Sequence, residues 1–193
     1  MALRIITGKH RGRKIESVPG KEVRPTTGFA REAIFNVLMH GRYAGENSPL
    51  VGKRVVDIFC GTGAMGFEAL SRGAAHVTLI DQNQKAMDAA RQTAEKFGET
   101  ANVSLIRSDS TNLPRAIRPC TLAFIDPPYE KGLAEKALHS VTRNGWLEDG
   151  AIVVVEQSKK EKLELPPEYT LLEERTYSIS RMSLLQYQAA QKN

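Results

Sequence analysis

From residue 54 to residue 156 the chain alternates between short β-rich runs and longer stretches in which apolar residues recur at helical spacing. Strands separated by helices pair in parallel through right-handed crossovers, which places helices on both faces of one sheet. The alternation therefore predicts a three-layer α/β sandwich. The predicted strands are Arg54–Phe59, His76–Asp81, Val103–Arg107, Thr121–Asp126 and Ile152–Glu156, and the predicted helices are Ala64–Arg72, Gln84–Phe97 and Glu130–Thr142.

The last part of the chain departs from this alternation. Two β-rich runs, Thr170–Ile179 and Met182–Tyr187, are separated by a short turn at Ser180 and Arg181. Because a short turn joins antiparallel strands, we expect a hairpin on one edge of the sheet. The complete sheet would then have seven strands and be mostly parallel.

The basic excess of the chain lies in its N-terminal quarter. The net charge is +5 overall, and residues 1–54 contain eleven Lys and Arg against four Glu. Such a segment on a nearly neutral body favours a polyanionic partner. We therefore expect residues 1–44 to form a basic extension and residues 50–193 to form the main domain.

Two elements are predicted within this extension. Leu3–Val18 alternates around a glycine break and is typical of a short hairpin, whose tip would carry His10, Arg11, Arg13 and Lys14. Apolar residues between Ala30 and Leu38 predict a helix that begins at a Thr26 or Thr27 cap and ends near Gly41.

Several classes of protein are disfavoured. The longest uninterrupted apolar run, Ala151–Val155, is far shorter than the ~20 residues of a membrane-spanning helix. The first nine residues hold no signal-peptide core, so a cytoplasmic location is expected. Cys60 and Cys120 lie 60 positions apart without metal-ligand spacing, and we expect neither a metal site nor a disulfide. Cys60 is interpreted as a small buried residue.

A glycine-containing turn follows the first predicted strand, in the pattern Gly61-x-Gly63-x-x-Gly66. Glycines between a strand and a helix let a ligand approach the backbone closely, so the turn favours a nucleoside-containing ligand over a simple packing turn. Asp81 ends the next strand, where its carboxylate is suited to a ribose diol. A helix N-cap is the alternative, and the neighbouring glycine turn favours the ribose. Asp109 follows the third strand and is a candidate for an adenine amino group, with a local turn as the alternative.

The end of the fourth predicted strand carries Asp126-Pro127-Pro128-Tyr129. Consecutive prolines fix an extended backbone, so the Asp126 carboxylate and the Pro127 carbonyl can converge on one amino group. Tyr129 adds a flat face for a base. A plain chain stop after the strand is the alternative, but the tetrapeptide together with the glycine turn favours an amino-methylating site.

The motif Asp57-x-Phe59-x-Gly61-x-Gly63, followed by Asp81 and by residues 126–129, resembles the class I S-adenosylmethionine-dependent amino-methyltransferases. Four N-terminal motifs and the segment 66–74 narrow the resemblance to the RsmD-like 16S ribosomal RNA guanine-N2 methyltransferases. These motifs are Arg4-Ile5-Ile6-x-Gly8, Arg11-Gly12-Arg13-Lys14, Arg24-Pro25-Thr26 and Arg31-Glu32-Ala33-Ile34-Phe35-Asn36. The sequence departs from this family at two places. Gly28-Phe29 stands where the family usually carries an acidic and a basic residue, and Asp81-Gln82-Asn83 stands where a Glu-x-Asp sequence is commoner.

The resemblance implies a Rossmann-like class I methyltransferase fold and methylation of the N2 amino group of a specific guanine (966 type) in 16S rRNA. It implies S-adenosylmethionine as the cofactor, no metal, and a monomer acting on the rRNA of an assembling small subunit. The implied catalytic residues are Asp126, Pro127, Pro128 and Tyr129, and the implied cofactor-binding residues are Asp57, Phe59, Gly61, Gly63, Asp81 and Asp109. The implied phosphate-binding residues are Arg11, Arg13, Lys14, Arg24 and Arg31.

Three other functions remain open from the sequence. The glycine pattern also fits an NAD-dependent Rossmann oxidoreductase, although Asp-Pro-Pro-Tyr offers it no hydride chemistry. The chain is also compatible with an RNA-binding module without catalysis, and with an adenine-N6 methyltransferase on RNA or DNA, because the tetrapeptide does not fix the base. The four histidines are assigned no role, and the mixed run Lys159–Lys162 is interpreted as a solvated loop.

Overall fold

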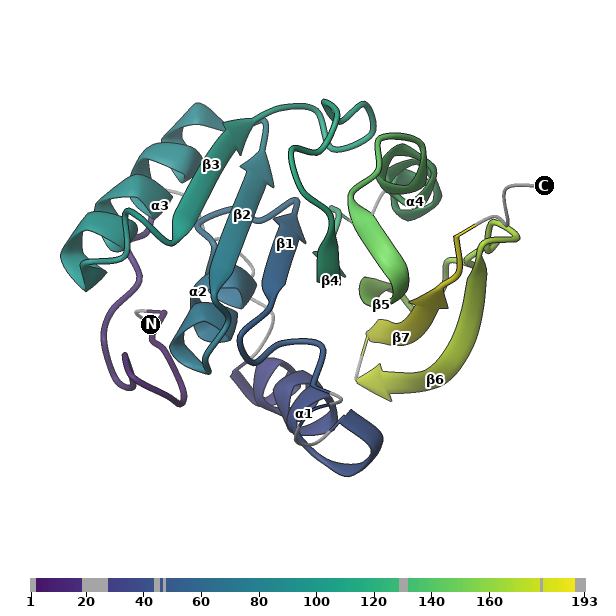
Figure 1. The fold of residues 1–193 in the computed structure, drawn as a ribbon, viewed down its shortest axis with the longest axis horizontal. Helices are drawn as coiled ribbons and strands as arrows, with labels where there is room; N and C mark the ends of the chain where they lie inside the picture. The colour runs from purple at the N-terminus through teal and green to yellow at the C-terminus, as the bar shows by residue number, and fades with distance from the viewer. Residues whose placement is uncertain are drawn as a thin grey trace.

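The computed structural model describes residues 3–18, 28–43, 46, 48–128, 132–177 and 179–189. Their core is a single seven-stranded sheet in the order β3-β2-β1-β4-β5-β7-β6, with helices on both faces (Figure 1). The strands are β1 (Arg54–Ile58), β2 (His76–Asp81), β3 (Val103–Arg107), β4 (Cys120–Ile125), β5 (Leu147–Ser158), β6 (Tyr169–Tyr177) and β7 (Ser180–Tyr187). The helices are α1 (Gly28–Met39), α2 (Ala64–Ser71), α3 (Gln84–Phe97) and α4 (Leu133–Arg143), with a 3-10 turn at Gly41–Tyr43.

The predicted α/β sandwich and its antiparallel hairpin are confirmed. Strands β1 to β5 are parallel, whereas β7 pairs antiparallel with both β5 and β6. Alternate residues of the buried strands face opposite layers, as strands covered on both sides require. In β4, Phe124 packs in the layer that contains α1, α2 and α3, and Ile125 packs in the layer that contains α4.

Several predicted strand boundaries were wrong, notably at the start of β5 and at the turn of the hairpin. β5 begins at Leu147, five positions before the predicted Ile152, because an irregularity between Cys120 and Leu122 lets Leu147 pair with β4 as well. Ser180 and Arg181 belong to β7 and pair with Ser158 and Gln157, so the turn of the hairpin lies just before them. At the other end of the sheet, the N-cap of α3 is Asn83, whose side chain accepts two backbone N–H groups, and not Asp81.

The N-terminal segment 3–18 folds back on itself and packs against α2 and α3. Arg4 and Lys14 form an antiparallel bridge, as expected of a hairpin, and the side chains of Ile5 and Ile15 are buried in the same core as Phe67 of α2. Ile34 of α1 lies in that core too. Segments expected to form a separate extension thus share one hydrophobic core with the main domain, while Thr26 and Thr27 lie outside the described residues.

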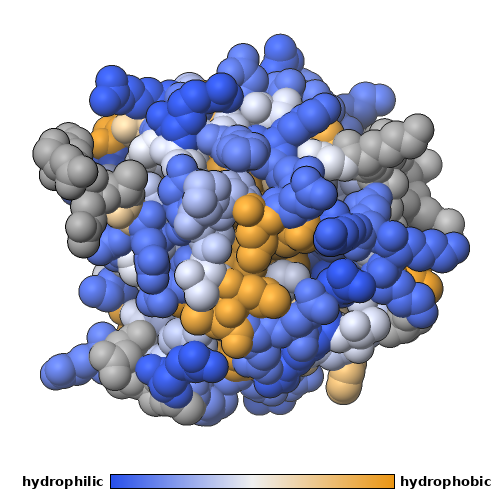
Figure 2. Space-filling view, turned by 90° about the vertical axis from the view of Figure 1, so that its right-hand side faces the viewer, coloured by the Kyte–Doolittle hydropathy of each residue, from blue (hydrophilic) through white to orange (hydrophobic). Residues whose placement is uncertain are grey.

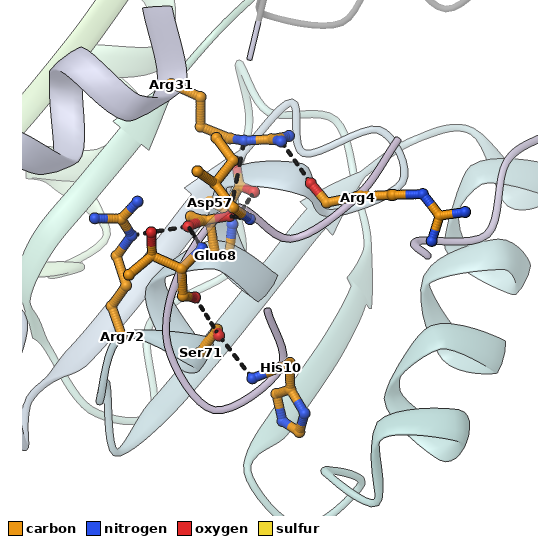
Figure 3. A network of polar contacts seen from close by, with 10 residues as sticks. Arg4, His10, Arg31, Asp57, Glu68, Ser71 and Arg72 are labelled. Carbon is orange, nitrogen blue, oxygen red and sulfur yellow. Dashed lines mark hydrogen bonds and ion pairs between the residues drawn. The ribbon is translucent and has the colours of Figure 1, made fainter. Parts of the chain in front are cut away.

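A fully buried carboxylate joins this segment to α2 (Figure 3). Glu68 accepts hydrogen bonds from the backbone N–H groups of Ile6 and Thr7, at 2.8 and 3.0 Å. Its other partners are the guanidinium groups of Arg72, at 2.8 Å, and of Arg31, at 3.9 Å. Because a buried charge is tolerated only when it is paired, Glu68 fixes where the N-terminal segment, α1 and α2 meet.

Replacing the buried carboxylate should therefore loosen the N-terminal segment. We expect Glu68→Gln to lower the free energy of unfolding by about 3 kcal/mol, since it leaves two buried guanidinium groups without their anion. The amides of Ile6 and Thr7 should exchange faster in a hydrogen-exchange experiment. Glu95→Gln, on the exposed face of α3, is the matched control. Unchanged exchange at both amides would contradict this role of Glu68.

Candidate active site

The register of the sheet aligns the carboxyl ends of β1, β2 and β4, after which the residues of the predicted site follow. Ile58 of β1 pairs with Ile80 of β2 on one side and with Ile125 of β4 on the other. The next residues along the three strands are Phe59, Asp81 and Asp126. Adjacent strands lie about 4.8 Å apart, so these residues meet at the carboxyl edge of the sheet. In open α/β sheets, this edge is where ligands bind.

The turn after β1 has an unusual backbone. Phe59 is, among the described residues, the non-glycine residue with a positive φ, at 61°. Gly61 and Gly63 follow with φ of 54° and 84°, a region that suits glycine. A side chain held in this conformation stores strain, and such strain clusters at binding sites.

Two carboxylates hold this turn by its backbone N–H groups. One oxygen of Asp81 accepts the N–H of Gly61 at 2.9 Å, and the other accepts the N–H of Asn83 at 2.8 Å. Asp57 accepts the N–H of Gly66, in the first turn of α2, at 2.9 Å. Asp57 and Asp81 therefore both brace the turn in this structure.

The three glycines of the motif differ in their surroundings. A Cβ atom on Gly66 would lie 2.3 Å from Leu79, and one on Gly63 would lie 2.8 Å from Leu79 and Phe67, so both glycines are needed for packing α2 on β2. A Cβ atom on Gly61 would meet nothing within 4 Å. The backbone of Gly61 therefore borders open space, which is what a ligand approaching the turn requires.

Burial and neighbouring charges shift the pKa of Asp57 strongly. Desolvation of this fully enclosed carboxyl raises its pKa to about 8, and the nearby carboxylates of Asp126 and Asp81 raise it further against the hydrogen bond from Gly66. With a pKa of about 8, Asp57 keeps its proton at neutral pH, and the negative charge at this edge of the sheet is that of the Asp126 and Asp81 carboxylates. A cationic ligand would relieve the repulsion, whereas an anionic one would add to it.

Of the remaining predicted ligand residues, those that the structure describes lie at the same edge. Asp126 is half-buried directly after β4, followed by a buried Pro127 and an exposed Pro128. Tyr129 lies outside the described residues. Asp109 is exposed, and one of its oxygens accepts hydrogen bonds from both the N–H and the hydroxyl of Thr111 at 2.8 Å, as in the local turn considered from the sequence.

Cys60 is buried beside Met87, and burial raises the pKa of its thiol, as expected of a packing residue.

The predicted phosphate-binding arginines have different environments. Arg11 and Lys14 are exposed, and Arg13 is exposed but lies over the Phe97 ring and donates to the Lys96 carbonyl. Arg24 lies outside the described residues. Arg31 is only 2% exposed and its guanidinium donates to the Arg4 carbonyl at 2.7 Å, so the phosphate contact predicted for it is wrong in this structure.

Two polar residues with structural roles were missed. His10, to which no partner was assigned, is buried against Phe97 and bonds to Glu99 at 2.7 Å. Burial opposes ionisation of Glu99, but hydrogen bonds from Asn102, Lys9 and His10 outweigh it and lower the pKa of Glu99 to about 2. Glu68 was missed as well, although a single acid in the otherwise apolar and small run Ala64–Ser71 is a signal of a buried partner.

The class of protein follows from the fold and this edge together. A seven-stranded sheet of this order, with a glycine turn after β1 beside Asp-Pro-Pro after β4, defines a class I methyltransferase. A putative methyltransferase from Escherichia coli superposes with a TM-score of 0.82 at 30% identity, covering 98% of this chain and 99% of that one. A putative methylase from Haemophilus influenzae gives 0.78 at 30% identity, covering 97% and 99%.

Sequence comparison gives the family. Ribosomal RNA small subunit methyltransferase D of Haemophilus influenzae is 34% identical over 188 residues, covering 95% of this chain and 93% of that protein. The Escherichia coli protein of the same name is 33% identical, covering 86% and 79%. The family described as "Conserved hypothetical protein 95" matches residues 3–186, and the chain belongs to it. The predicted resemblance to the RsmD-like methyltransferases is thereby confirmed. Within the described residues no helix has the length and apolar character to cross a membrane.

The raised pKa of Asp57 predicts a specific pH dependence. An unfolded Asp titrates near 3.9, so between that pH and about 8 the folded state keeps a proton that the unfolded state loses. Stability contributed by this group is present at low pH and is lost as the pH rises through 8. In Asp57→Asn the amide oxygen still accepts the Gly66 N–H without titrating. From pH 6 to pH 8, wild type should lose about 1–2 kcal/mol relative to the variant in urea unfolding. Parallel pH profiles of the two proteins would refute the assignment.

Proposed function

We propose that this protein methylates the exocyclic N2 amino group of a specific guanine in 16S ribosomal RNA, at the position of the 966 type, using S-adenosylmethionine. The observation that carries the proposal is the placement of Asp126-Pro127-Pro128 directly beside the Gly61 turn, on adjacent strands and at the same level. The ligand that offers a methyl group and the amino group that receives it would thus meet at one edge of the sheet.

The residues of this edge fit such a cofactor. Open space over Gly61 admits a ligand to the backbone, and the concentrated carboxylates favour a ligand carrying a sulfonium and an ammonium group. The turn around Gly61 and Gly63 would hold the methionine part, with Asp57 as its brace, Asp81 would reach the ribose, and Asp109 would reach the adenine. When bound, the cofactor supplies the methyl group.

Asp126 and Pro127 would act on the target amino group. The lone pair of a guanine N2 nitrogen is delocalised into the ring, which makes it a poor nucleophile. Hydrogen bonds from this amino group to the Asp126 carboxylate and the Pro127 carbonyl favour the pyramidal geometry needed for attack. Positive charge develops on the nitrogen as the new bond forms, and Asp126 is placed to accept the proton that leaves. Tyr129 would stack on the base, which has to leave its own helix or loop.

The basic N-terminal segment supports an RNA substrate. Arg11 and Lys14 are exposed on a segment that Glu68 ties to α2, the helix that follows the cofactor turn. Relatives across most of the chain are named ribosomal RNA small subunit methyltransferases. We infer from both that the partner is small-subunit RNA, in an assembling particle, and that the protein acts as a cytoplasmic monomer.

The other functions considered have less support. A dinucleotide would bring an anionic pyrophosphate next to carboxylates that already repel one another, which disfavours an NAD-dependent enzyme. The intact Asp126-Pro127-Pro128 sequence at the sheet edge disfavours a non-catalytic module. An adenine-N6 methyltransferase would use the same chemistry. The methylated nucleoside that forms distinguishes it from a guanine-N2 methyltransferase.

The function is tested by identifying the product. Radiolabelled S-adenosylmethionine is incubated with the protein and either naked small-subunit RNA or partly assembled small subunits, and the RNA is digested to nucleosides. Label in N2-methylguanosine supports the proposal, and comparison of the two substrates shows whether protein is required. Label in N6-methyladenosine would move the target to adenine, and tight RNA binding without label would favour the non-catalytic module.

Asp126 should be required for turnover but not for cofactor binding. We expect Asp126→Ala to lower kcat by about 100-fold or more, since it removes both a hydrogen-bond acceptor and the proton acceptor. The affinity for S-adenosylhomocysteine, measured by calorimetry, should stay close to that of wild type. Asp88→Ala, an exposed change on α3, is the control. Complete loss of cofactor binding in Asp126→Ala would overturn the assigned role.

A further inference from the structure

The hairpin of β6 and β7 ends at the same edge of the sheet as the proposed active site. Val155 of β5 pairs with Ile125 at the end of β4, and β5 continues to Ser158, which pairs with Ser180 at the start of β7. The turn between β6 and β7 therefore lies beyond the carboxyl edge that carries Asp126. β7 is two positions from β4 in the sheet, a lateral separation of about 10 Å.

An exposed aromatic pair lies at this turn. The ring of Phe29, at the start of α1, meets the ring of Tyr177, at the end of β6, edge to face with centroids 6.3 Å apart and an interplanar angle of 77°. Figure 1 shows this end of the hairpin beside α1. Phe29 is 74% exposed, whereas Phe35, Phe67 and Phe124 are almost fully buried. An edge-to-face contact leaves most of such a ring open to a further partner.

The surroundings of this pair are apolar and basic. Ile179 is 43% exposed, and its carbonyl accepts the N–H of Lys159 at 3.0 Å. Lys159 and Lys160 are both exposed, so the run interpreted as a solvated loop lies against the turn of the hairpin. Figure 2 shows the side of the molecule that carries β6, where an apolar patch is surrounded by hydrophilic side chains.

We infer that Phe29 and Tyr177 form a stacking platform for an unpaired nucleobase next to the target nucleotide, with Lys159 and Lys160 contacting the adjoining phosphates. Aromatic faces with neighbouring cations are the usual means of binding single-stranded RNA. The platform lies at the edge where the target base has to enter. Tyr177 is on β6, three strand spacings or about 14 Å from β4, within reach of a flanking nucleotide. This inference rests on the proposed function for an RNA substrate, but not on which base is methylated.

The platform is tested by RNA affinity without turnover. Wild type and Phe29→Ala are titrated with naked small-subunit RNA in the presence of S-adenosylhomocysteine. Loss of one stacked base should weaken binding about tenfold. The salt dependence of binding should stay the same, because stacking releases no counterions, whereas Lys159→Ala with Lys160→Ala should make it shallower. Phe29→Tyr should restore affinity, and Phe29→Trp should show fluorescence quenching when RNA binds.

Ile117→Ala is the matched control, since Ile117 is 96% exposed and precedes β4 at the opposite edge of the sheet. Wild-type affinity in Phe29→Ala, or failure of Phe29→Tyr to restore affinity, would overturn the inference. The inference would also be overturned if Phe29→Ala bound naked RNA normally but no longer bound the assembling particle, since the aromatic pair would then be a protein-docking surface. Failure of the proposed function would appear instead as a wild-type product other than N2-methylguanosine, which leaves this affinity test unaffected.

Discussion

The turn between β1 and α2 depends on two carboxylates that accept backbone N–H groups. Asp81 holds Gly61 and Asp57 holds Gly66, so the two ends of the turn are fixed by side chains from β2 and β1. The close packing of Gly66 on Leu79 keeps α2 against the sheet. These contacts leave the backbone of Gly61 beside open space and concentrate negative charge there, which is the basis for a cationic ligand.

The same helix carries the contact that extends this arrangement to the N-terminal segment. Glu68 lies two residues after Gly66, and its buried carboxylate binds the N–H groups of Ile6 and Thr7. His10 and Glu99 make a second attachment, to the end of α3. The basic segment is thus fastened to α2, which follows the Gly61 turn, and to the end of α3, which follows β2.

Local patterns predicted the fold well and the long-range polar contacts poorly. The spans His76–Asp81, Gln84–Phe97 and Val103–Arg107 agree with β2, α3 and β3 because apolar periodicity is a local signal. The burial of Arg31 and His10 was not predictable in this way, because their partners Glu68 and Glu99 are distant in sequence. The carboxyl-edge positions of Asp81 and Asp126 were predictable, since parallel strands bring their ends together. The roles proposed for Asp126, Asp81 and Asp109 in binding and catalysis stay predictions. So do those of Tyr129 and Arg24, which lie outside the described residues.

The central claim is that one edge of the sheet holds both the methyl donor and the target amino group. A crystal structure of the protein with S-adenosylhomocysteine tests it most directly. The account predicts the ligand over the backbone of Gly61, its ribose at Asp81, and its sulfur facing the side of the edge where Asp126 follows β4. A ligand bound away from this turn, or one whose sulfur faces away from Asp126, would contradict the account.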